Sequence, residues 1–438
     1  MTTTRSGVTL MLALGVFRVA ALSAQTEQAG RGAPRSDDGG ERTASAARIL
    51  ADIKYLADDA REGRGVGTAG LDSSAAYIAR QFGRAGLVPV GRNGYFQSFV
   101  LDSTAPALAH AGLKPGRVKN VIGVMPGKGK LGGEAIVIGA HYDHLGRGGF
   151  GAQDPESTGV VHNGADDNAS GTAAVMEIAR LLRPRARDAG DVRTIFFVAF
   201  TAEELGIIGS SYYVAHPSFP IDSTYAMLNL DMVGRMVDNR LLALGTQTAV
   251  ELLAVLDTVN ADYGLSLAGS GDGWGSSDHA AFTPARIPVL HFFTGIHPDY
   301  HRTTDDWQKI NVDGEAKVAA FVADIAWKFA TRTAPLTYVA LPPPRLAAGK
   351  GSRAYLGTLP DMGSTPGGVR VSGVTPGSPA EAAGIKGGDV LIRIGRLQIK
   401  NLDDMQRALV EHKSGETVEI ALKRGADTVT VKATLGKR

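Results

Sequence analysis

The sequence predicts an α/β fold, in which a doubly wound, mostly parallel sheet is followed by a smaller α+β unit. Strand-length apolar runs alternate with helical patterns across residues 43–335, which is typical of a sheet with helices on both faces. The runs are apolar at nearly every position, so the strands are expected to be buried on both sides. A stretch rich in proline, 336–352, has linker composition and precedes residues 353–438, where the strands become shorter. The length of 438 residues exceeds one ordinary core and agrees with two domains.

The N-terminus has the pattern of a secretory signal peptide. Arg5 precedes the apolar run Val8–Phe17, and small residues end at Ala24. We therefore predict a signal peptide over 1–24 and a secreted or periplasmic protein. The run is shorter than the ~20 residues that a membrane span needs, and no later segment is long enough, so no span is expected in the mature chain. Residues 25–42 are polar and glycine-rich, and are expected to be a disordered linker.

Hydrophobic periodicity predicts the elements of the large domain in order. Apolar residues at three- and four-residue spacing predict helices over 46–59, 73–87, 169–183 and 249–264. Continuous apolar runs predict strands over 118–125, 134–140, 194–200, 225–234 and 287–293. In the second unit, strands are expected over 367–375, 389–395, 417–425 and 428–435, with helical pieces over 378–384 and 401–412.

Composition excludes several classes of site and partner. The chain has no cysteine, so disulfides, zinc–thiolate sites and thiol nucleophiles are excluded. Any bound metal must be held by His, Asp and Glu. The 46 basic and 44 acidic residues give a net charge of +2, which indicates no nucleic-acid or anionic-membrane partner.

Polar residues that can bind metal follow several of the predicted strands. Open α/β sheets bind ligands at the carboxyl ends of their strands, so these residues are expected at one edge. In chain order they are His141, Asp143, Asp166, Asp167, Glu203, Glu204, Asp231, His297, Asp299, His301 and Asp305.

Each candidate also has an ordinary structural explanation. Asp166 or Asp167 can cap the following helix, Glu203 with Glu204 can form a solvated first turn, and His141 can be an edge histidine. Asp231 resists such an explanation, because an unpaired carboxylate in an apolar strand pattern is costly without a cation or a proton. Taken together, the candidates favour a metal centre.

Five short stretches that contain most of these candidate residues also form a set of motifs. They are HYD (141–143), GADDNASG (164–171), AEELG (202–206), LDM (230–232) and HRTTD (301–305). The set resembles the M28 family of co-catalytic zinc peptidases, which includes bacterial leucyl-type aminopeptidases and glutamate carboxypeptidases. The resemblance covers roughly residues 43–335, follows the family order, and implies the zinc exopeptidase fold.

The resemblance implies a centre with two Zn²⁺ ions and a zinc-bound hydroxide that hydrolyses peptides. Asp166 would bridge the ions, His141 and Asp231 would hold one, and Glu204 and His301 would hold the other. The same ligands accept Co²⁺ or Mn²⁺.

Two further residues complete the implied site. Glu203 would be the general base, and Asp143 would orient the His141 ring. The family also has a cis peptide bond after the bridging aspartate, which would here be Asp166–Asp167.

Four activities remain open from the sequence. An aminopeptidase is favoured, because GADDNASG and GSSDHAAF are more similar to bacterial aminopeptidases, and no basic cluster is placed to bind a substrate carboxylate. Arg302 is the residue that could reverse this choice. The alternatives are a carboxypeptidase on the same scaffold, glutaminyl cyclase with a single zinc, and a peptide-binding protein without catalysis.

Other residues of the domain carry weaker expectations. The segment Ser277–His279 either lines the substrate pocket, as a similar segment does in the family, or is a loop with a helix cap. His144, His162 and His297 match no family motif and are interpreted as surface or loop histidines.

The second unit resembles the PDZ domain, on the run GSPAEAAGIKGGDVLIRIG (377–395). Tyr355–Gly357 then corresponds to the carboxylate-binding loop of PDZ domains. The resemblance implies capture of a peptide or protein C-terminus that adds a strand. The alternative is a module that only packs on the peptidase or mediates assembly.

Overall fold

The computed structural model of the chain describes residues 43–90, 93–101, 108, 111–342, 354–360, 367–375, 377–400 and 402–437. The predicted signal peptide and the segment 25–42 lie outside these residues. In the described ranges, no helix combines the length and the apolar character that crossing a membrane requires.

The large domain is built on a mixed sheet in the order β1-β3-β5-β4-β6-β9-β7-β8, with β2 paired to β3. The centre of the sheet is parallel: β5, β4, β6 and β9 all run in one direction. On the outer sides β3 and β7 pair antiparallel with this centre. The strands are β1 (Val88–Pro89), β2 (Phe96–Leu101), β3 (Gly116–Met125), β4 (Ala135–His141), β5 (Thr194–Phe200), β6 (Thr224–Leu230), β7 (Arg240–Leu244), β8 (Ser266–Ser270) and β9 (Val289–Phe293).

Both faces of the central strands are buried, as the continuous apolar runs predict. In β4, Ile136 and Ile138 belong to one hydrophobic core, while Ala135 and Val137 belong to another on the opposite face. This alternation follows from the two-residue period of a strand. The central strands are therefore rigid supports for whatever follows their carboxyl ends.

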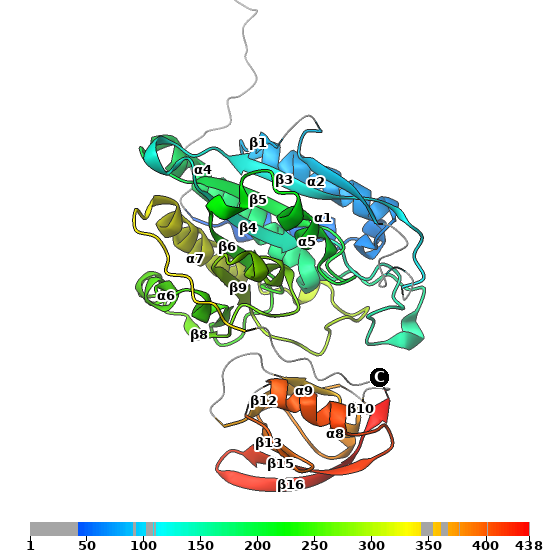
Figure 1. Cartoon of the computed structure of the whole chain (residues 1–438). Coiled ribbons are helices and arrows are strands. Elements are labelled where there is room, and N and C mark those ends of the chain that lie inside the picture. Colours follow the sequence, from blue (N-terminus) through cyan, green and yellow to red (C-terminus); the bar gives the residue numbers. More distant parts are fainter. Residues whose placement is uncertain are drawn as a thin grey trace, which may run out of the picture. The chain divides into compact units, whose positions relative to one another are not determined.

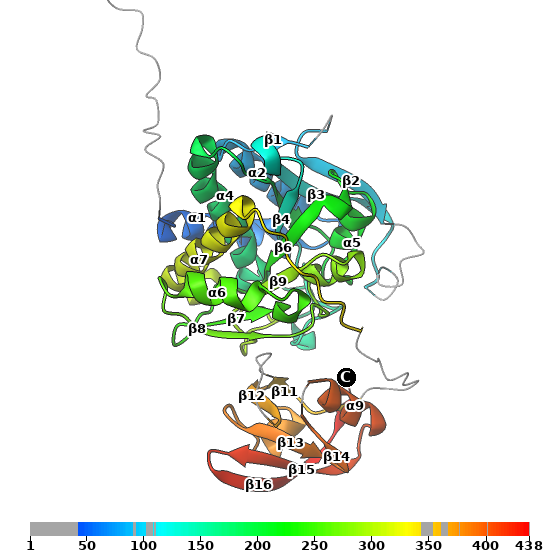
Figure 2. The same ribbon diagram turned by 60° about the vertical axis from the view of Figure 1, so that its left-hand side comes forward.

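Helices cover the two faces of the sheet. Figure 2 shows α1, α4 and α7 on one side of the central strands and α5 on the other. Three helices begin at polar side chains that accept a backbone N–H, which are Ser45 for α1, Thr68 for α2 and Asn311 for α7. The helices are α1 (Ala46–Leu56), α2 (Ala69–Arg84), α4 (Gly171–Asp188), α5 (Ile208–Ala215), α6 (Leu252–Asn260) and α7 (Val312–Thr331).

The second unit is a small antiparallel sheet with two helices (Figure 1). The strand order is β11-β12-β13-β15-β16, and its core includes Val371, Leu391, Ile420 and Leu422. Its elements are β10 (Ala354–Tyr355), β11 (Thr358–Pro360), β12 (Val369–Val374), α8 (Pro379–Ala382), β13 (Val390–Ile394), β14 (Leu397–Gln398), α9 (Leu402–Glu411), β15 (Thr417–Arg424), β16 (Asp427–Thr434) and β17 (Gly436–Lys437).

The predicted linker 336–352 begins later than expected. Thr337 bonds to Glu251 through both its N–H and its hydroxyl, and the N–H of Val339 donates to the carbonyl of Thr248. The indole N–H of Trp274 donates to the carbonyl of Leu341. These contacts attach residues 337–341 to the large domain. The sequence composition could not reveal them, because it gives no information on backbone pairing. Residues 343–353 lie outside the described ranges.

Candidate metal centre

The central strands deliver the candidate ligands to one edge of the sheet. His141 is the last residue of β4, Glu203 and Glu204 follow β5, and Asp231 directly follows β6. His301 lies in the loop after β9. Because β5, β4, β6 and β9 are parallel neighbours, their carboxyl ends meet at this edge.

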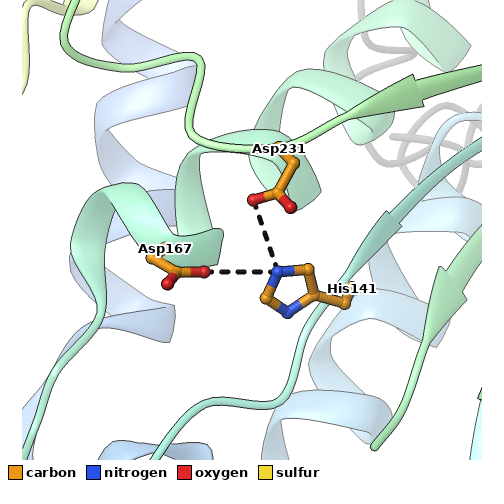
Figure 3. A group of neighbouring side chains, drawn as sticks. All are labelled: His141, Asp167 and Asp231. Carbon is orange, nitrogen blue, oxygen red and sulfur yellow. Dashed lines mark ion pairs between the residues drawn. The ribbon is translucent and has the colours of Figure 1, made fainter. Parts of the chain in front are cut away.

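The first group of donor atoms consists of His141, Asp167 and Asp231 (Figure 3). His141 Nε2 lies 3.2 Å from Asp167 Oδ1 and 3.4 Å from Asp231 Oδ1. His141 and Asp167 are buried, and Asp231 is partly exposed. The three side chains converge from two strand ends and from the segment before α4.

The second group consists of His144, Asp167 and Glu204, with His301 beside it. His144 Nδ1 lies 2.8 Å from Glu204 Oε1. His301 Nε2 lies 3.0 Å from Asp167 Oδ2 and 3.2 Å from Glu204 Oε2. Asp167 therefore belongs to both groups, with one oxygen toward each.

The expectation that Asp166 occupies the shared position is wrong. The Asp166 carboxylate accepts from the Gly234 N–H and the Ser170 hydroxyl, and its second oxygen lies 3.1 Å from His297 Nε2. It points to a separate buried network and not to His141 or His301. The cis peptide bond is likewise one residue later than expected, between Asp167 and Asn168.

Hydrogen bonds from two directions position Asp167. The carboxylate of Asp305 accepts the N–H groups of Asp166 and Asp167 at 3.0 and 3.1 Å. The Asn168 side chain donates to the Leu230 carbonyl and accepts from the Met232 N–H, which ties this segment to the end of β6. The loop carrying Asp167 is thus fixed to the strand end that carries Asp231.

Gly164 allows this segment to approach His144 closely. Its φ is +55°, which favours glycine, and a Cβ at this position would lie 2.2 Å from the Asp167 carbonyl oxygen and 2.4 Å from His144 Cδ2. A side chain here would push the shared aspartate away from the imidazole.

Asp143 contacts the site differently from the expectation. His141 Nδ1 lies 3.1 Å from the backbone oxygen of Asp143, and 3.9 Å from its carboxylate. The carboxylate instead accepts the N–H groups of Glu203 and Glu204 at 3.1 and 3.4 Å. Asp143 therefore orients the ring through its carbonyl and holds the Glu203–Glu204 turn through its side chain.

The geometry and chemistry of both groups fit zinc. Four ligands at ~2.0–2.1 Å from a tetrahedral zinc ion lie roughly 3.3 Å from one another. The nitrogen–oxygen distances of 3.2 and 3.4 Å at His141 match this spacing, as do the 3.0 and 3.2 Å at His301. Imidazole and carboxylate donors are those that zinc prefers in the absence of thiolate.

The charges of the site separate two kinds of carboxylate. Burial raises the pKa of Asp167, but hydrogen bonds from His141 and His301 outweigh burial and hold that pKa well below its ordinary value. For Glu204, burial is likewise outweighed, chiefly by the charge of His301, and the pKa falls to about 2. Burial raises the pKa of Glu203 well above its ordinary value, and nearby carboxylates add to this. Glu203 can therefore remain protonated under conditions in which Asp167 and Glu204 are ionised.

Three residues of the site have left-handed backbone although none is glycine. The φ angles are +56° at Ala202, +52° at Met232 and +56° at His301. Ala202 precedes Glu203, and Met232 follows Asp231. Such backbone is unfavourable for residues with a Cβ and concentrates at functional sites, which supports the assignment of this edge.

The three histidines interpreted as surface or loop residues do lie in loops, but they are not on the surface. His144, His162 and His297 are 2%, 0% and 8% exposed. His144 contacts Glu204, His297 contacts Asp166, and His162 contacts Asp154. The sequence does carry a signal for His144, since it lies in HYDH (141–144), three residues after His141. No family motif requires a histidine at this position.

A cavity of about 120 Å³ opens beside the first group. Its walls include Ser277 and His279. The segment Ser277–His279 therefore lines the pocket through these two residues, which is one of the two predictions made for it from the sequence. Sequence reasoning missed most of the other wall residues, which are Met232, Leu244, Trp274, His291, Phe293, Ile296 and Tyr300. They come from distant strands and loops and have no common motif.

Comparisons with known proteins identify relatives of both parts of the chain. Residues 120–326 match the model of peptidase family M28, and residues 352–435 match that of the PDZ domain. The aminopeptidase YwaD of Bacillus subtilis (strain 168) is 31% identical over 213 residues, which are 44% of this chain and 40% of that protein. The chain spans less than two thirds of the length of the curated relatives that it matches.

Two solved structures share the fold of the large domain. BSAP, a zinc aminopeptidase from Bacillus subtilis, has a TM-score of 0.53 at 21% identity, over 69% of this chain and 100% of that chain. Porphyromonas gingivalis glutaminyl cyclase has a TM-score of 0.54 at 20% identity, over 65% and 98%. Since both activities occur on this fold, the site residues must distinguish them.

Proposed function

Because the chain carries a domain of peptidase family M28 followed by a PDZ domain, we propose that it is a zinc-dependent aminopeptidase. The observation that carries this proposal is the pair of imidazole–carboxylate groups that share Asp167 beside a cavity. Such a pair would hold two metal ions, as in two-metal aminopeptidases. The aminopeptidase among the relatives adds support.

In this proposal Asp167 would contribute one oxygen to each of two zinc ions. His141 and Asp231 would hold the first ion, and Glu204 and His301 would hold the second. When bound, zinc supplies Lewis acidity toward the scissile carbonyl and lowers the pKa of water. Co²⁺ or Mn²⁺ suits the same donors.

Glu203 is the proposed general base. It lines the cavity, and its Oε2 lies 4.0 Å from His141 Nε2, so it faces the first ion without completing either group. It takes a proton from water and returns it to the leaving amine. Asp143 positions this base by accepting its backbone N–H.

The cavity supports an aminopeptidase over a carboxypeptidase. No lysine or arginine, Arg302 included, is among the described residues that line the cavity. Asp167, Glu203 and Asp231 do line it, and their charge suits a free amino group. Two metal groups also favour this activity over glutaminyl cyclase, which needs one zinc, and over a binding protein, which needs neither ligands nor a base.

We further propose that the PDZ domain binds a peptide or protein C-terminus. Gly357 in the predicted carboxylate-binding loop has φ +83°, and the Leu356 carbonyl accepts the Ala380 N–H, which fixes the loop against α8. PDZ domains capture a carboxylate with the backbone N–H groups of this loop. Export to the periplasm or the exterior remains a prediction from residues 1–24.

The decisive experiment is cleavage of an unblocked peptide panel, with N-acetylated and C-amidated versions of each peptide. The chain without residues 1–24 is assayed before and after chelation and zinc return. We expect zinc-dependent release of N-terminal residues, abolished by acetylation and insensitive to amidation. Loss of cleavage on amidation instead would indicate a carboxypeptidase, and cyclisation of N-terminal glutamine without hydrolysis would indicate the cyclase.

A variant separates metal binding from catalysis in the same assay. Glu203→Gln keeps the shape of the base but cannot take a proton, so kcat should fall by several orders of magnitude while two zinc ions stay bound. Zinc content measured by elemental analysis is the control. Turnover near that of the wild type would exclude Glu203 as the base.

A further inference from the structure

The cavity beside the first group has an uncharged inner wall. Its charged lining residues are those of the metal centre, and the described residues of the rest of the wall are apolar, hydroxyl-bearing or imidazole. Its volume of about 120 Å³ is somewhat smaller than the 150 Å³ of a cavity that binds benzene. The space therefore suits one medium-sized side chain without charge.

A chain of hydrogen bonds connects the metal centre to this wall. The Ser277 hydroxyl donates to Asp231 Oδ2 at 2.7 Å, and the Asn229 amide nitrogen donates to Ser277 Oγ at 2.8 Å. The same amide nitrogen lies 3.0 Å from Nδ1 of His291, which lines the cavity. All of these contacts are buried or partly buried.

The direction of every bond in this chain follows from its first member. The Ser277 hydroxyl has a single proton, which it donates to Asp231, so it must accept from Asn229. The Asn229 atom that contacts Ser277 is therefore the NH₂ group. That group has no lone pair to offer, so His291 Nδ1 accepts from it and the His291 proton is on Nε2.

The rest of the surroundings keep this imidazole neutral and leave its edge free. Burial lowers the pKa of His291 to about 3, and the neighbouring His279 adds to this. Two rings stack with the imidazole, His279 at 4.5 Å and Phe293 at 5.9 Å between ring centroids. The hydrogen bonds found among the described residues do not involve Nε2, so this N–H donor is the polar atom that remains for a ligand.

From this chain we infer that His291 is a specificity-determining residue, which lets the cavity take N-terminal side chains that are uncharged and carry a hydrogen-bond acceptor. Asparagine and threonine are accepted alongside their apolar isosteres leucine and valine. The inference rests on the proposed aminopeptidase function. Its physical basis is that an apolar side chain leaves the Nε2–H donor without a partner, whereas an amide or hydroxyl oxygen satisfies it.

The test uses two isosteric pairs of substrates, Asn with Leu and Thr with Val, at the N-terminus of one peptide. We measure kcat/KM for the wild type, His291→Phe and His291→Gln. The phenylalanine keeps the stacking on His279 and Phe293 but removes the donor, so the Asn/Leu and Thr/Val ratios should fall about tenfold. The glutamine variant supplies an N–H and should recover part of each ratio.

The outcomes separate this inference from the proposed function. Ratios in His291→Phe within about twofold of the wild type overturn the inference while the aminopeptidase stands. Absence of hydrolysis of every peptide counts against the proposed function instead. In that case, or where a variant does not fold, ¹⁵N NMR of the wild-type imidazoles still decides: a proton on Nε2 of neutral His291 is expected, and a proton on Nδ1 overturns the inference.

Discussion

The two halves of the proposed metal centre are held in different ways. The first half takes His141 from the end of β4 and Asp231 from the end of β6, two strands that are paired and buried. The second half takes His301 from a loop, in a left-handed backbone conformation. Its ring is oriented by the Gly151 carbonyl, which lies 2.9 Å from Nδ1. One half thus depends on the sheet and the other on contacts between loops.

Asp154 is the main connection between those loops. Its carboxylate accepts from the N–H and the hydroxyl of Thr303, both at 2.9 Å, and lies 2.8 Å from His162 Nε2. The adjacent Gln153 N–H donates to the His301 carbonyl at 2.8 Å. The second half can therefore be weakened without touching a ligand, whereas the first half can hardly be weakened without damage to the sheet.

The largest effect is expected at Asp167, since it belongs to both halves. Asp167→Asn removes the charge that the two groups share, so zinc content should fall from two ions per chain to less than one, with loss of activity. Asp166→Asn is the matched control at the neighbouring position and should retain two ions. The measurement is zinc stoichiometry by elemental analysis on protein whose circular dichroism matches the wild type. The reverse result, with metal lost only in Asp166→Asn, would restore the assignment made from the sequence.

Asp166 and Asp167 also show what could not be predicted from the sequence. Polar residues after buried strands are a local pattern, so the strand ends and the fold could be predicted. Asp166 and Asp167 are equivalent by that criterion. What distinguishes them is backbone conformation: Asp167, with φ −107° and ψ 92°, and Asn168 after it are non-helical in the turn before α4, whereas Asp166 is helical. That conformation depends on Asp305, far along the chain, which no local pattern reveals.

His144 illustrates the same limit in the second half. Its partner Glu204 is 60 residues away, and the ring reaches it because the loops after β4 and β5 come together at the sheet edge. Sequence reasoning could place both loops at that edge but could not predict which side chains turn inward. The loop-held half was accordingly the less completely predicted one.

A smaller effect, confined to the second half, is expected from Asp154. Asp154→Ala removes the acceptor for Thr303 and frees the His301 loop, so the affinity for one zinc ion should fall about 10–100-fold while the other stays bound. Asp188→Ala is the control, because this aspartate is 77% exposed in its side chain and pairs only with the adjacent Arg187 among the ion pairs of the described residues. Chelator titration should show two separate release steps in Asp154→Ala. Simultaneous release of both ions would show that the halves are not independent.

The smallest effect is expected from removing the PDZ domain, and where the cut is made should matter. Every residue of the proposed site lies before residue 342, so deletion of 343–438 should leave kcat/KM for short peptides within about twofold of the full chain. Deletion of 336–438 also removes Thr337 and Val339, and the Leu341 carbonyl that accepts the indole N–H of Trp274 in the cavity wall. Loosening that wall acts beside the strand-held half, in the cavity proposed to bind substrate, so KM should rise a few-fold while both zinc ions remain. Equal kinetics for the two deletions would mean that residues 336–342 belong to the linker, as composition first suggested. Loss of zinc in either deletion would mean that residues outside the sheet and the loops described above also support the two halves.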